Sequence, residues 1–266
     1  MEEPKKKFKI VTDTRARVIL PNTLTLIGVC VGLSSINFAL NQNYKLAIVA
    51  ILFAAVIDGL DGRIARLIRG TSKVGKELDS LTDIISFGVA PAFIMYFWTL
   101  SSLGKIGWLL SLIYVVCVAL RLARFNINTG VDPSWKDNFF EGVPSPAGGI
   151  IVLSPLIYDV SELNFINLNY ELITPIIFII TSILLISKIP TYSLKKIIVP
   201  RSTTIFLLFG IVLLFGLLLI FTFKALIIGC LVYLLALPVS YIHYKKIEKK
   251  FVNENKFNEE EPEDFL

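Results

Sequence analysis

The sequence predicts an all-α fold, a polytopic membrane bundle of about eight transmembrane helices. Its composition comes first: hydrophobic residues make up 55% and charged residues 18% of 266, and the mean hydropathy is +0.71. Soluble domains have roughly 45–50% apolar and about 25% charged residues. Apolar stretches also recur along the chain, and lysines and arginines gather between alternate stretches. These observations exclude an ordinary soluble domain.

Eight stretches approach the roughly 20 apolar residues that cross a bilayer: about 18–40, 45–63, 82–101, 105–125, 145–158, 172–187, 203–223 and 225–243. The fifth is short and contains Pro146 and Pro155, so it is the weakest of the eight. The first is no cleavable signal peptide, because it is long, lacks a small-residue cleavage site and precedes further spans.

The distribution of lysine and arginine predicts the orientation, since these residues concentrate in cytoplasmic loops. With eight alternating spans and a cytoplasmic N-terminus, only Lys45, Lys105 and Lys224 of the 26 basic residues face outward. An odd number of spans would break this pattern. We therefore expect an integral protein of the cell (inner) membrane with both termini in the cytoplasm.

The two tails differ in charge. Residues 1–17 are basic and lie either on the membrane surface or free in solution. Residues 244–266 end in an acidic, polar stretch that we expect to be disordered. The net charge of +5 and the pI near 9.0 suit anionic membrane lipids as well as nucleic acid. In a chain this apolar we expect membrane lipids as partners and no nucleic acid.

Cysteine and histidine offer little chemistry here. Cys30, Cys117 and Cys230 are far apart in apolar stretches, so they form neither a disulfide framework nor a CxxC metal site. The single histidine, His243, excludes a multi-histidine zinc site and disfavours a histidine-based triad.

Four aspartates stand where apolar residues are expected. Asp58 and Asp61 end the second apolar stretch, and Asp79 and Asp83 precede or open the third. A charge at the centre of a membrane helix costs ~2.5–3.5 kcal/mol, so such residues have a partner or a function. Spacings of three and four place each pair on one helix face. Because a short cytoplasmic turn joins the two helices, we expect all four carboxylates to converge near the cytoplasmic boundary.

Converging carboxylates repel one another unless positive charge lies among them. Arg63 and Arg66 could neutralise part of this charge. Oxygen ligands without histidine or cysteine favour hard divalent ions, so the better explanation is Mg²⁺ or Mn²⁺. Two such ions could hold both the entering and leaving oxygens of a phosphoryl displacement. Taken alone, each acid pair is equally consistent with a structural ion pair or an ion pathway.

Eight residues around these acids form a spaced pattern over 26 positions: Asp58-x2-Asp61-Gly62-x2-Ala65-Arg66-x8-Gly75-x3-Asp79-x3-Asp83. This pattern resembles the signature of the CDP-alcohol phosphotransferases. These are membrane enzymes that transfer a phosphatidyl or related group from a CDP-linked donor to an alcohol. The resemblance implies a six-helix catalytic domain over residues 18–201, followed by two additional spans in 202–243. It also implies a homodimer, because family members commonly pair.

The resemblance implies roles for individual residues. The four aspartates would bind two divalent metal ions, and Asp83 would also be the general base. Residues 21–25 (PNTLT) are similar to the first-helix motif of the family. The implied CDP-donor-binding residues are Asn22, Thr25, Gly62, Ala65, Arg66 and Gly75. For Asn22, helix capping is the simpler alternative.

Four further segments, 86–92, 121–126, 141–147 and 187–193, resemble family members that use serine as the acceptor. The implied reaction converts CDP-diacylglycerol and L-serine to phosphatidylserine and CMP. A site for the serine carboxylate needs a fork of guanidinium donors. Arg121 and Arg124 lie on one helix face at the depth of the acids, with Asn126 nearby. The alternative for either arginine is anchoring at the membrane surface.

Three alternatives remain at this stage. The same family includes enzymes for other acceptors, such as glycerol phosphate, inositol phosphate or choline. A cation-coupled transporter would place the acids near mid-bilayer within broken helices. A non-catalytic membrane scaffold would have no use for the spaced acids.

Overall fold

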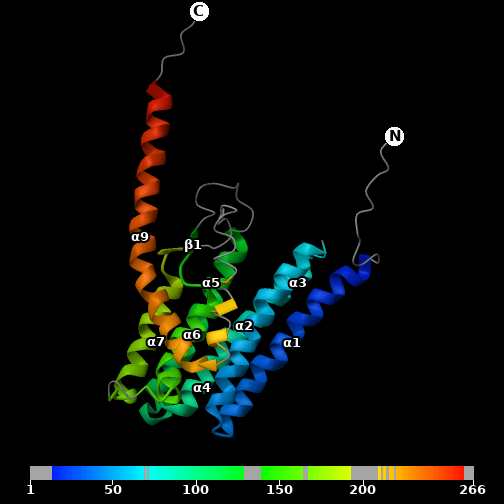
Figure 1. The fold of residues 1–266 in the computed structure, drawn as a ribbon, viewed down its shortest axis with the longest axis vertical. Helices are drawn as coiled ribbons and strands as arrows, with labels where there is room; N and C mark the ends of the chain where they lie inside the picture. Colours follow the sequence, from blue (N-terminus) through cyan, green and yellow to red (C-terminus); the bar gives the residue numbers. More distant parts are fainter. Residues whose placement is uncertain are drawn as a thin grey trace, which may run out of the picture.

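The computed structural model describes residues 14–68, 70, 72–128, 139–163, 167–192, 209–210, 212–213, 216–218 and 220–260. Helices dominate these residues, and Figure 1 shows them side by side in a bundle. The α-helices are α1 (Thr14–Leu40), α2 (Tyr44–Leu67), α3 (Lys73–Asp83), α4 (Ala90–Trp98), α5 (Lys105–Asn128), α6 (Ser145–Val160), α7 (Tyr170–Ile186) and α9 (Thr222–Glu260). The shorter elements are the π-helix η1 (Ile84–Val89), the 3₁₀ helix η2 (Leu100–Leu103), and the strands β1 (Phe139–Glu141) and β2 (Pro190–Tyr192).

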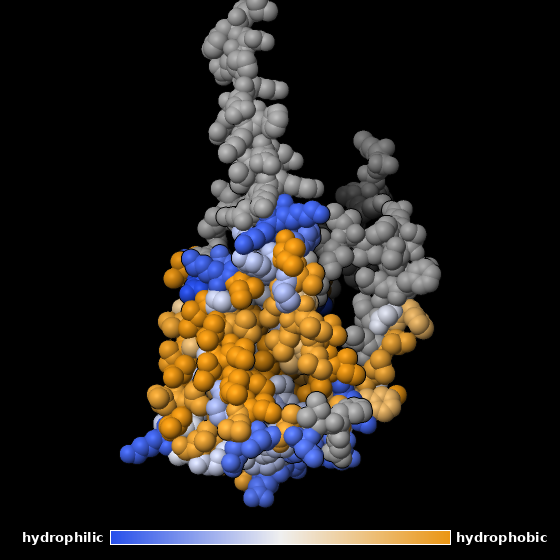
Figure 2. All heavy atoms as spheres, turned by 90° about the vertical axis from the view of Figure 1, so that its left-hand side faces the viewer, coloured by the Kyte–Doolittle hydropathy of each residue, from blue (hydrophilic) through white to orange (hydrophobic). Residues whose placement is uncertain are grey.

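Several helices of this bundle suit a membrane. Four described segments are long and apolar enough to cross one: Ile19–Leu40, Lys73–Trp98, Lys105–Ile127 and Thr222–Ile247. The helices α6 and α7 are apolar but shorter. Figure 2 shows hydrophobic residues covering the middle of one face, with hydrophilic residues gathered towards its two ends. The prediction of a helical membrane protein is confirmed at this level, whereas the count of eight spans stays a prediction.

The observed helices differ from the predicted spans in detail. The third span begins earlier, because α3, η1 and α4 are continuous from Lys73 to Trp98. The second span corresponds to α2, which is 24 residues long but carries charges within its apolar stretch. About half of the expected seventh span, 203–223, lies outside the described residues, as does most of the basic tail, 1–17.

A small antiparallel sheet that the sequence did not predict adds to the helical fold. Phe139 pairs with Tyr192 and Glu141 with Pro190, which joins the segments before α6 and after α7. The Thr191 side chain also donates to the Gly142 carbonyl, at 3.0 Å. Gly142 has a φ of 74°, and a Cβ there would lie 2.8 Å from the Ser187 carbonyl oxygen. Three-residue strands so far apart in the chain have no periodicity that a sequence could reveal.

The helix α9 continues to Glu260 rather than ending near residue 243, where the last apolar stretch ends. No glycine or proline occurs between Pro238 and Pro262 to stop the helix. Once a helix is formed, each further residue adds a hydrogen bond at little cost. The helix therefore extends into most of the stretch expected to be disordered, and only residues 261–266 lie outside the described structure.

The π-helix η1 begins directly after Asp83, and a proline explains part of its geometry. Pro91 has no N–H, so the carbonyl of Phe87, four residues earlier, loses its usual helical donor. The buried Tyr114 hydroxyl of α5 donates to this carbonyl instead, at 2.7 Å. Single-turn π segments often occur at functional sites. Here η1 alters the helical register immediately after an acidic residue.

Close packing of α1 positions the acid-bearing helices. The helix α1 packs along α2 and also contacts α3, η1 and α4. At Gly32 a Cβ would clash with Ser86 of η1, so glycine is required for this approach. One turn earlier, the Ser86 hydroxyl donates to the Gly28 carbonyl at 3.4 Å. Because α1 contacts both α2 and α3, it fixes one relative to the other.

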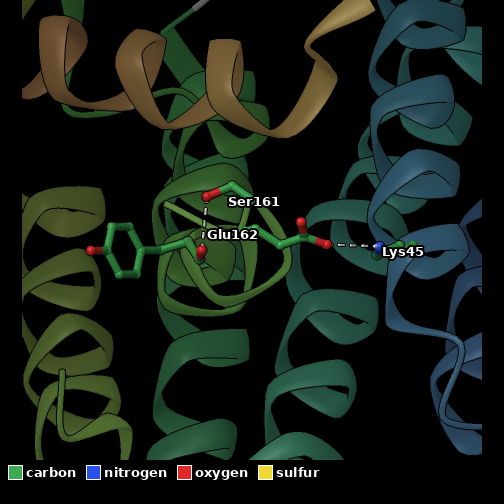
Figure 3. Close-up of polar contacts among 4 residues, drawn as sticks. Lys45, Ser161 and Glu162 are labelled. Atoms are coloured by element: carbon green, nitrogen blue, oxygen red, sulfur yellow. Dashed lines mark hydrogen bonds and ion pairs between the residues drawn. The ribbon is translucent and has the colours of Figure 1, made fainter. Parts of the chain in front are cut away.

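An exposed ion pair marks the other end of the bundle. Lys45, at the start of α2, lies 3.8 Å from Glu162, just after α6 (Figure 3). A pair this exposed adds little to stability. The turn between α1 and α2 lies at the lower end of the bundle in Figure 1, whereas α1 begins and α9 ends at the upper end.

Candidate active site

Three of the four predicted acids form one cluster. Asp58 and Asp61 come from the second half of α2 and Asp79 from α3. Carboxylate oxygens of the three residues lie within 4.8 Å of one another. Asp61 is buried, while Asp58 and Asp79 are half-buried. The spacing of three on α2 places its two acids on the face turned towards α3.

Asp83 borders this cluster rather than joining the group of three. It lies one turn after Asp79, and its carboxyl group lies within hydrogen-bonding reach of that of Asp58. Asp58 is also within this reach of Asp79, so it lies between the two acids of α3. Arg121 of α5 interacts electrostatically with Asp83. All four acids therefore belong to one site, with a guanidinium on the Asp83 side.

The unpaired oxygens of this site fit a bound cation. Asp61 Oδ1 and Asp83 Oδ1 are buried and have no hydrogen-bond partner among the described residues. Asp61 Oδ2 accepts a hydrogen bond from the Thr25 hydroxyl, at 2.6 Å. A buried anionic oxygen without a partner is costly, and a metal ion would remove this cost. Because every ligand is a carboxylate, the set suits Mg²⁺ or Mn²⁺.

The predicted donor-binding residues surround the acids in two groups. Asn22 of α1 lies against Gly75 of α3, where a Cβ would be 2.8 Å from the Asn22 Oδ1. Thr25 is buried and bonds to Asp61, so its described contact positions an acid.

The second group lies on α2 beyond Asp61. A Cβ at Gly62 would meet no atom within 4 Å, which leaves open space beside the acids. Ala65 is half-buried, and the exposed Arg66 donates from Nε to the Gly62 carbonyl of its own helix, at 3.0 Å. This face of α2 has room for a ligand.

The three predicted serine-binding residues have separate surroundings. Arg121 donates from Nη1 to the Ser145 hydroxyl at 2.6 Å, and its buried Nε has no partner among the described residues. Arg124 donates to the Ile186 carbonyl, the last residue of α7, at 2.8 Å. The Asn126 side chain donates to Ser80 of α3, at 2.9 Å. Of these three residues, Arg121 combines an electrostatic interaction with an acid and a buried donor that has no partner among the described residues.

Sequence reasoning missed two residues beside Arg121. Ser145 is the first residue of α6 and holds the guanidinium. Ser145 occurs in the segment 141–147, which resembles family members that use serine, but the resemblance implied no role for this residue. Tyr233 of α9 also interacts electrostatically with Arg121. It lies in an apolar stretch of a helix thought to be additional, and no sequence signal distinguished it.

The sequence that forms this site matches a known protein family. The sequence model of the CDP-alcohol phosphatidyltransferase family matches residues 18–242. The chain therefore belongs to this family of membrane proteins. The match runs past residue 201 and covers most of the membrane part of α9, including Tyr233.

Individual relatives carry a more specific name. The chain is 43% identical to the CDP-diacylglycerol–serine O-phosphatidyltransferase of Mycobacterium leprae over 187 residues, which is 68% of this chain and 61% of that protein. It is 36% identical to the protein of the same name from Helicobacter pylori, over 67% of this chain and 74% of the relative. It is 34% identical to the protein of the same name from Methanocaldococcus jannaschii, over 68% of this chain and 78% of that relative. The chain thus spans less than two thirds of the mycobacterial relatives it matches.

The acid cluster predicts that divalent ions stabilise the fold. Saturating Mg²⁺ or Mn²⁺ should raise the thermal unfolding midpoint of the detergent-solubilised protein by about 5 °C or more, because an ion at 100 times its Kd adds ~2.7 kcal/mol. Asp61→Asn should reduce this rise strongly. The matched control is Asp159→Asn at the far end of α6, which should retain it. Equal rises in all three proteins would place the metal elsewhere.

Proposed function

We propose that this protein transfers the phosphatidyl group of CDP-diacylglycerol to the hydroxyl of L-serine, giving phosphatidylserine and CMP. The observation that carries this proposal is the four-acid site of α2 and α3 with Arg121 beside Asp83. The names of the relatives supply the acceptor and the lipid donor. The geometry of the site explains how each substrate could be held.

The donor carries a diphosphate, which needs positive charge at the acids. We assign two divalent ions to Asp58, Asp61, Asp79 and Asp83, and choose Mg²⁺ or Mn²⁺ from the all-oxygen ligand set. When bound, these ions would neutralise the diphosphate and favour the departure of CMP. Asn22, Gly62, Ala65, Arg66 and Gly75 would surround the nucleotide, and Thr25 would hold Asp61 in place through its hydrogen bond.

Asp83 is the proposed general base. It accepts the proton of the serine hydroxyl while the hydroxyl oxygen attacks the phosphorus that bears the diacylglycerol. The bond from this phosphorus to the bridging oxygen breaks, and CMP leaves with the electron pair. The position of Asp83 at the edge of the group of three, next to Arg121, suits a residue that faces the acceptor.

Arg121 is the proposed partner of the serine carboxylate. Its Nη1 is held by Ser145, and its Nε is a buried donor that a carboxylate could satisfy. Arg124 and Asn126 stay in the proposal as residues that shape this side of the site, through their contacts with α7 and α3. A guanidinium that is already oriented loses little entropy when it binds.

We further propose eight membrane spans, cytoplasmic termini and an active site facing the cytoplasm of the cell membrane. The start of α1 and the end of α9 at one end of the bundle support an even number of spans. The excess of basic residues in the segments assigned to the cytoplasm supports the orientation. The same proposal includes the formation of a homodimer and a six-helix catalytic domain that ends at residue 201.

An acceptor panel tests the reaction. Purified protein with CDP-diacylglycerol should release CMP with L-serine far faster than with glycerol phosphate, inositol phosphate or choline, and a chelator should abolish the release. Mass spectrometry of the lipid product identifies what is formed. Faster release with another alcohol would refute serine as the acceptor and keep the enzyme class, whereas metal-dependent transport without CMP would refute the class.

Replacement of the base separates chemistry from binding. Asp83→Asn should lower kcat by roughly a hundredfold or more, which is the range expected for loss of a general base. Binding of the CDP-lipid, measured at equilibrium without serine, should be retained. Substantial residual turnover would show that Asp83 is not the general base.

Conservative replacement of the arginine tests the acceptor pocket. Arg121→Lys should raise the KM for serine by about tenfold and that for the donor much less, because an ammonium cannot reproduce the guanidinium fork. Arg124→Lys is the matched comparison, and its smaller rise should reflect its bond to α7. An unchanged serine KM in Arg121→Lys would place serine recognition elsewhere.

A further inference from the structure

The segment that leads into α6 is attached to its neighbours at consecutive residues. The strand β1 ends at Glu141, and the two residues after it continue the attachment. The Gly142 N–H donates to the Ile189 carbonyl at 2.9 Å, and the Val143 N–H donates to the Leu184 carbonyl at 3.4 Å. The acceptors belong to α7 and to the segment that joins α7 to β2. The backbone is therefore held on both sides of the point where the chain turns into α6.

Two buried hydroxyls extend this attachment to β2 and α9. The Thr191 hydroxyl of β2 donates to the Gly142 carbonyl at 3.0 Å. The Ser240 hydroxyl of α9 donates to the Pro190 carbonyl at 2.7 Å. Thr191 and Ser240 are 2% and 1% exposed, and a buried hydrogen bond is stronger than one in water. The two hydroxyls thus fix β2 between α9 and the start of α6.

An apolar cluster forms a second link between α9 and the start of α6. Val143, which is 1% exposed, belongs to a buried cluster with Cys230 and Leu237 of α9. Leu237 is three residues before Ser240, so the two side chains lie near one another on the same face of the helix. The hydrogen bond and the apolar contact therefore act on the same stretch of α9.

The held segment ends at the residue that binds the arginine. Ser145, the first residue of α6, is buried, and its hydroxyl accepts a hydrogen bond from Arg121 Nη1 at 2.6 Å. Pro144 alone separates Val143 from Ser145, and its ring fixes its φ. A displacement of the strand pair would therefore reach Ser145 over a short, stiff path. The orientation of the Arg121 guanidinium depends on where Ser145 lies.

We propose that Thr191 and Ser240 are positioning residues for the acceptor. By fixing β2 and the start of α6, they set the position of Ser145, which holds Arg121 for the serine carboxylate. Their hydroxyls donate to backbone carbonyls, so they act on the guanidinium through Ser145. A guanidinium fork recognises a carboxylate only in a defined geometry, which makes the acceptor more sensitive than the donor. The inference rests on the proposed function for the identity of the acceptor.

The first test removes each hydroxyl and measures the steady-state kinetics of CMP release. Ser240→Ala should raise the KM for serine by about threefold, the scale of one weakened hydrogen bond, and should change the KM for CDP-dioleoylglycerol and kcat little. Thr191→Val, which keeps the volume and loses the hydroxyl, should have the same effect. Thr191→Ser, which keeps the hydroxyl, should retain a serine KM close to that of the wild type.

A double-mutant cycle tests whether the effect passes through Ser145. Ser145→Ala alone should raise the serine KM by about fivefold, because Arg121 loses its hydrogen bond. Adding Ser240→Ala to Ser145→Ala should change the serine KM little further, whereas independent sites would give additive effects. A residue that only stabilises the fold would give no such coupling.

Ser111→Ala is the matched control. Its buried hydroxyl also donates to a backbone carbonyl, that of Gly107 at 3.0 Å, and it lies on α5 ten residues before Arg121. Thermal unfolding should show about the same small loss of stability in Ser111→Ala and Ser240→Ala. The serine KM should be unchanged in Ser111→Ala alone of these two variants.

The contrary outcomes are distinct. An unchanged serine KM in folded Ser240→Ala and Thr191→Val would overturn the proposal. Equal rises in the KM for serine and for the donor would also overturn it, as would additive effects in the double-mutant cycle. If Ser240→Ala does not fold, the comparison of Thr191→Val with Thr191→Ser decides. Failure of the proposed function is separate, since it would appear in the wild type as the absence of serine-dependent release of CMP.

Discussion

The structure depends on holding several carboxylates together where α2 and α3 meet. Asp58, Asp61 and Asp79 offer oxygens within 4.8 Å of one another, and Asp83 lies within hydrogen-bonding reach of the first of them. Like charges this close repel, and partial burial strengthens the repulsion. Arg121 supplies one positive charge beside Asp83. The remaining negative charge is the physical basis for assigning divalent ions to this site.

Much of the packing around the site keeps these acids in position. The helix α1 reaches α2 and α3 at once, with Thr25 bonded to Asp61 and Asn22 lying against Gly75. The π-helix η1 follows Asp83, and its Phe87 carbonyl is satisfied by Tyr114 from α5. The Thr25–Asp61 and Tyr114–Phe87 hydrogen bonds pair polar groups within the bundle, where water is scarce and an unpaired group is costly. The rigidity of the site therefore comes from neighbouring helices as well as from α2 and α3.

The helix α9 belongs to the same unit more closely than its position in the sequence suggests. The family match continues to residue 242, and Tyr233 interacts electrostatically with Arg121. The Ser240 hydroxyl also donates to the Pro190 carbonyl of β2, at 2.7 Å. The helix α9 thus packs against the segment that follows α7, whatever the boundary of the proposed six-helix core. Its apolar sequence gave no sign of this, because apolar residues face lipid and protein alike.

The sequence by itself determined the helical membrane class, the approximate positions of most described helices, and the convergence of the acids of α2 and α3. Hydrophobic length and residue spacing are local properties, so a one-dimensional pattern carries them. Only the tertiary structure decided which side chains meet across the bundle: Arg121 with Ser145, Arg124 with Ile186, and Asn126 with Ser80. It also decided the strand pair and its contact with α9. These features depend on contacts between residues far apart in the chain, which no local spacing specifies.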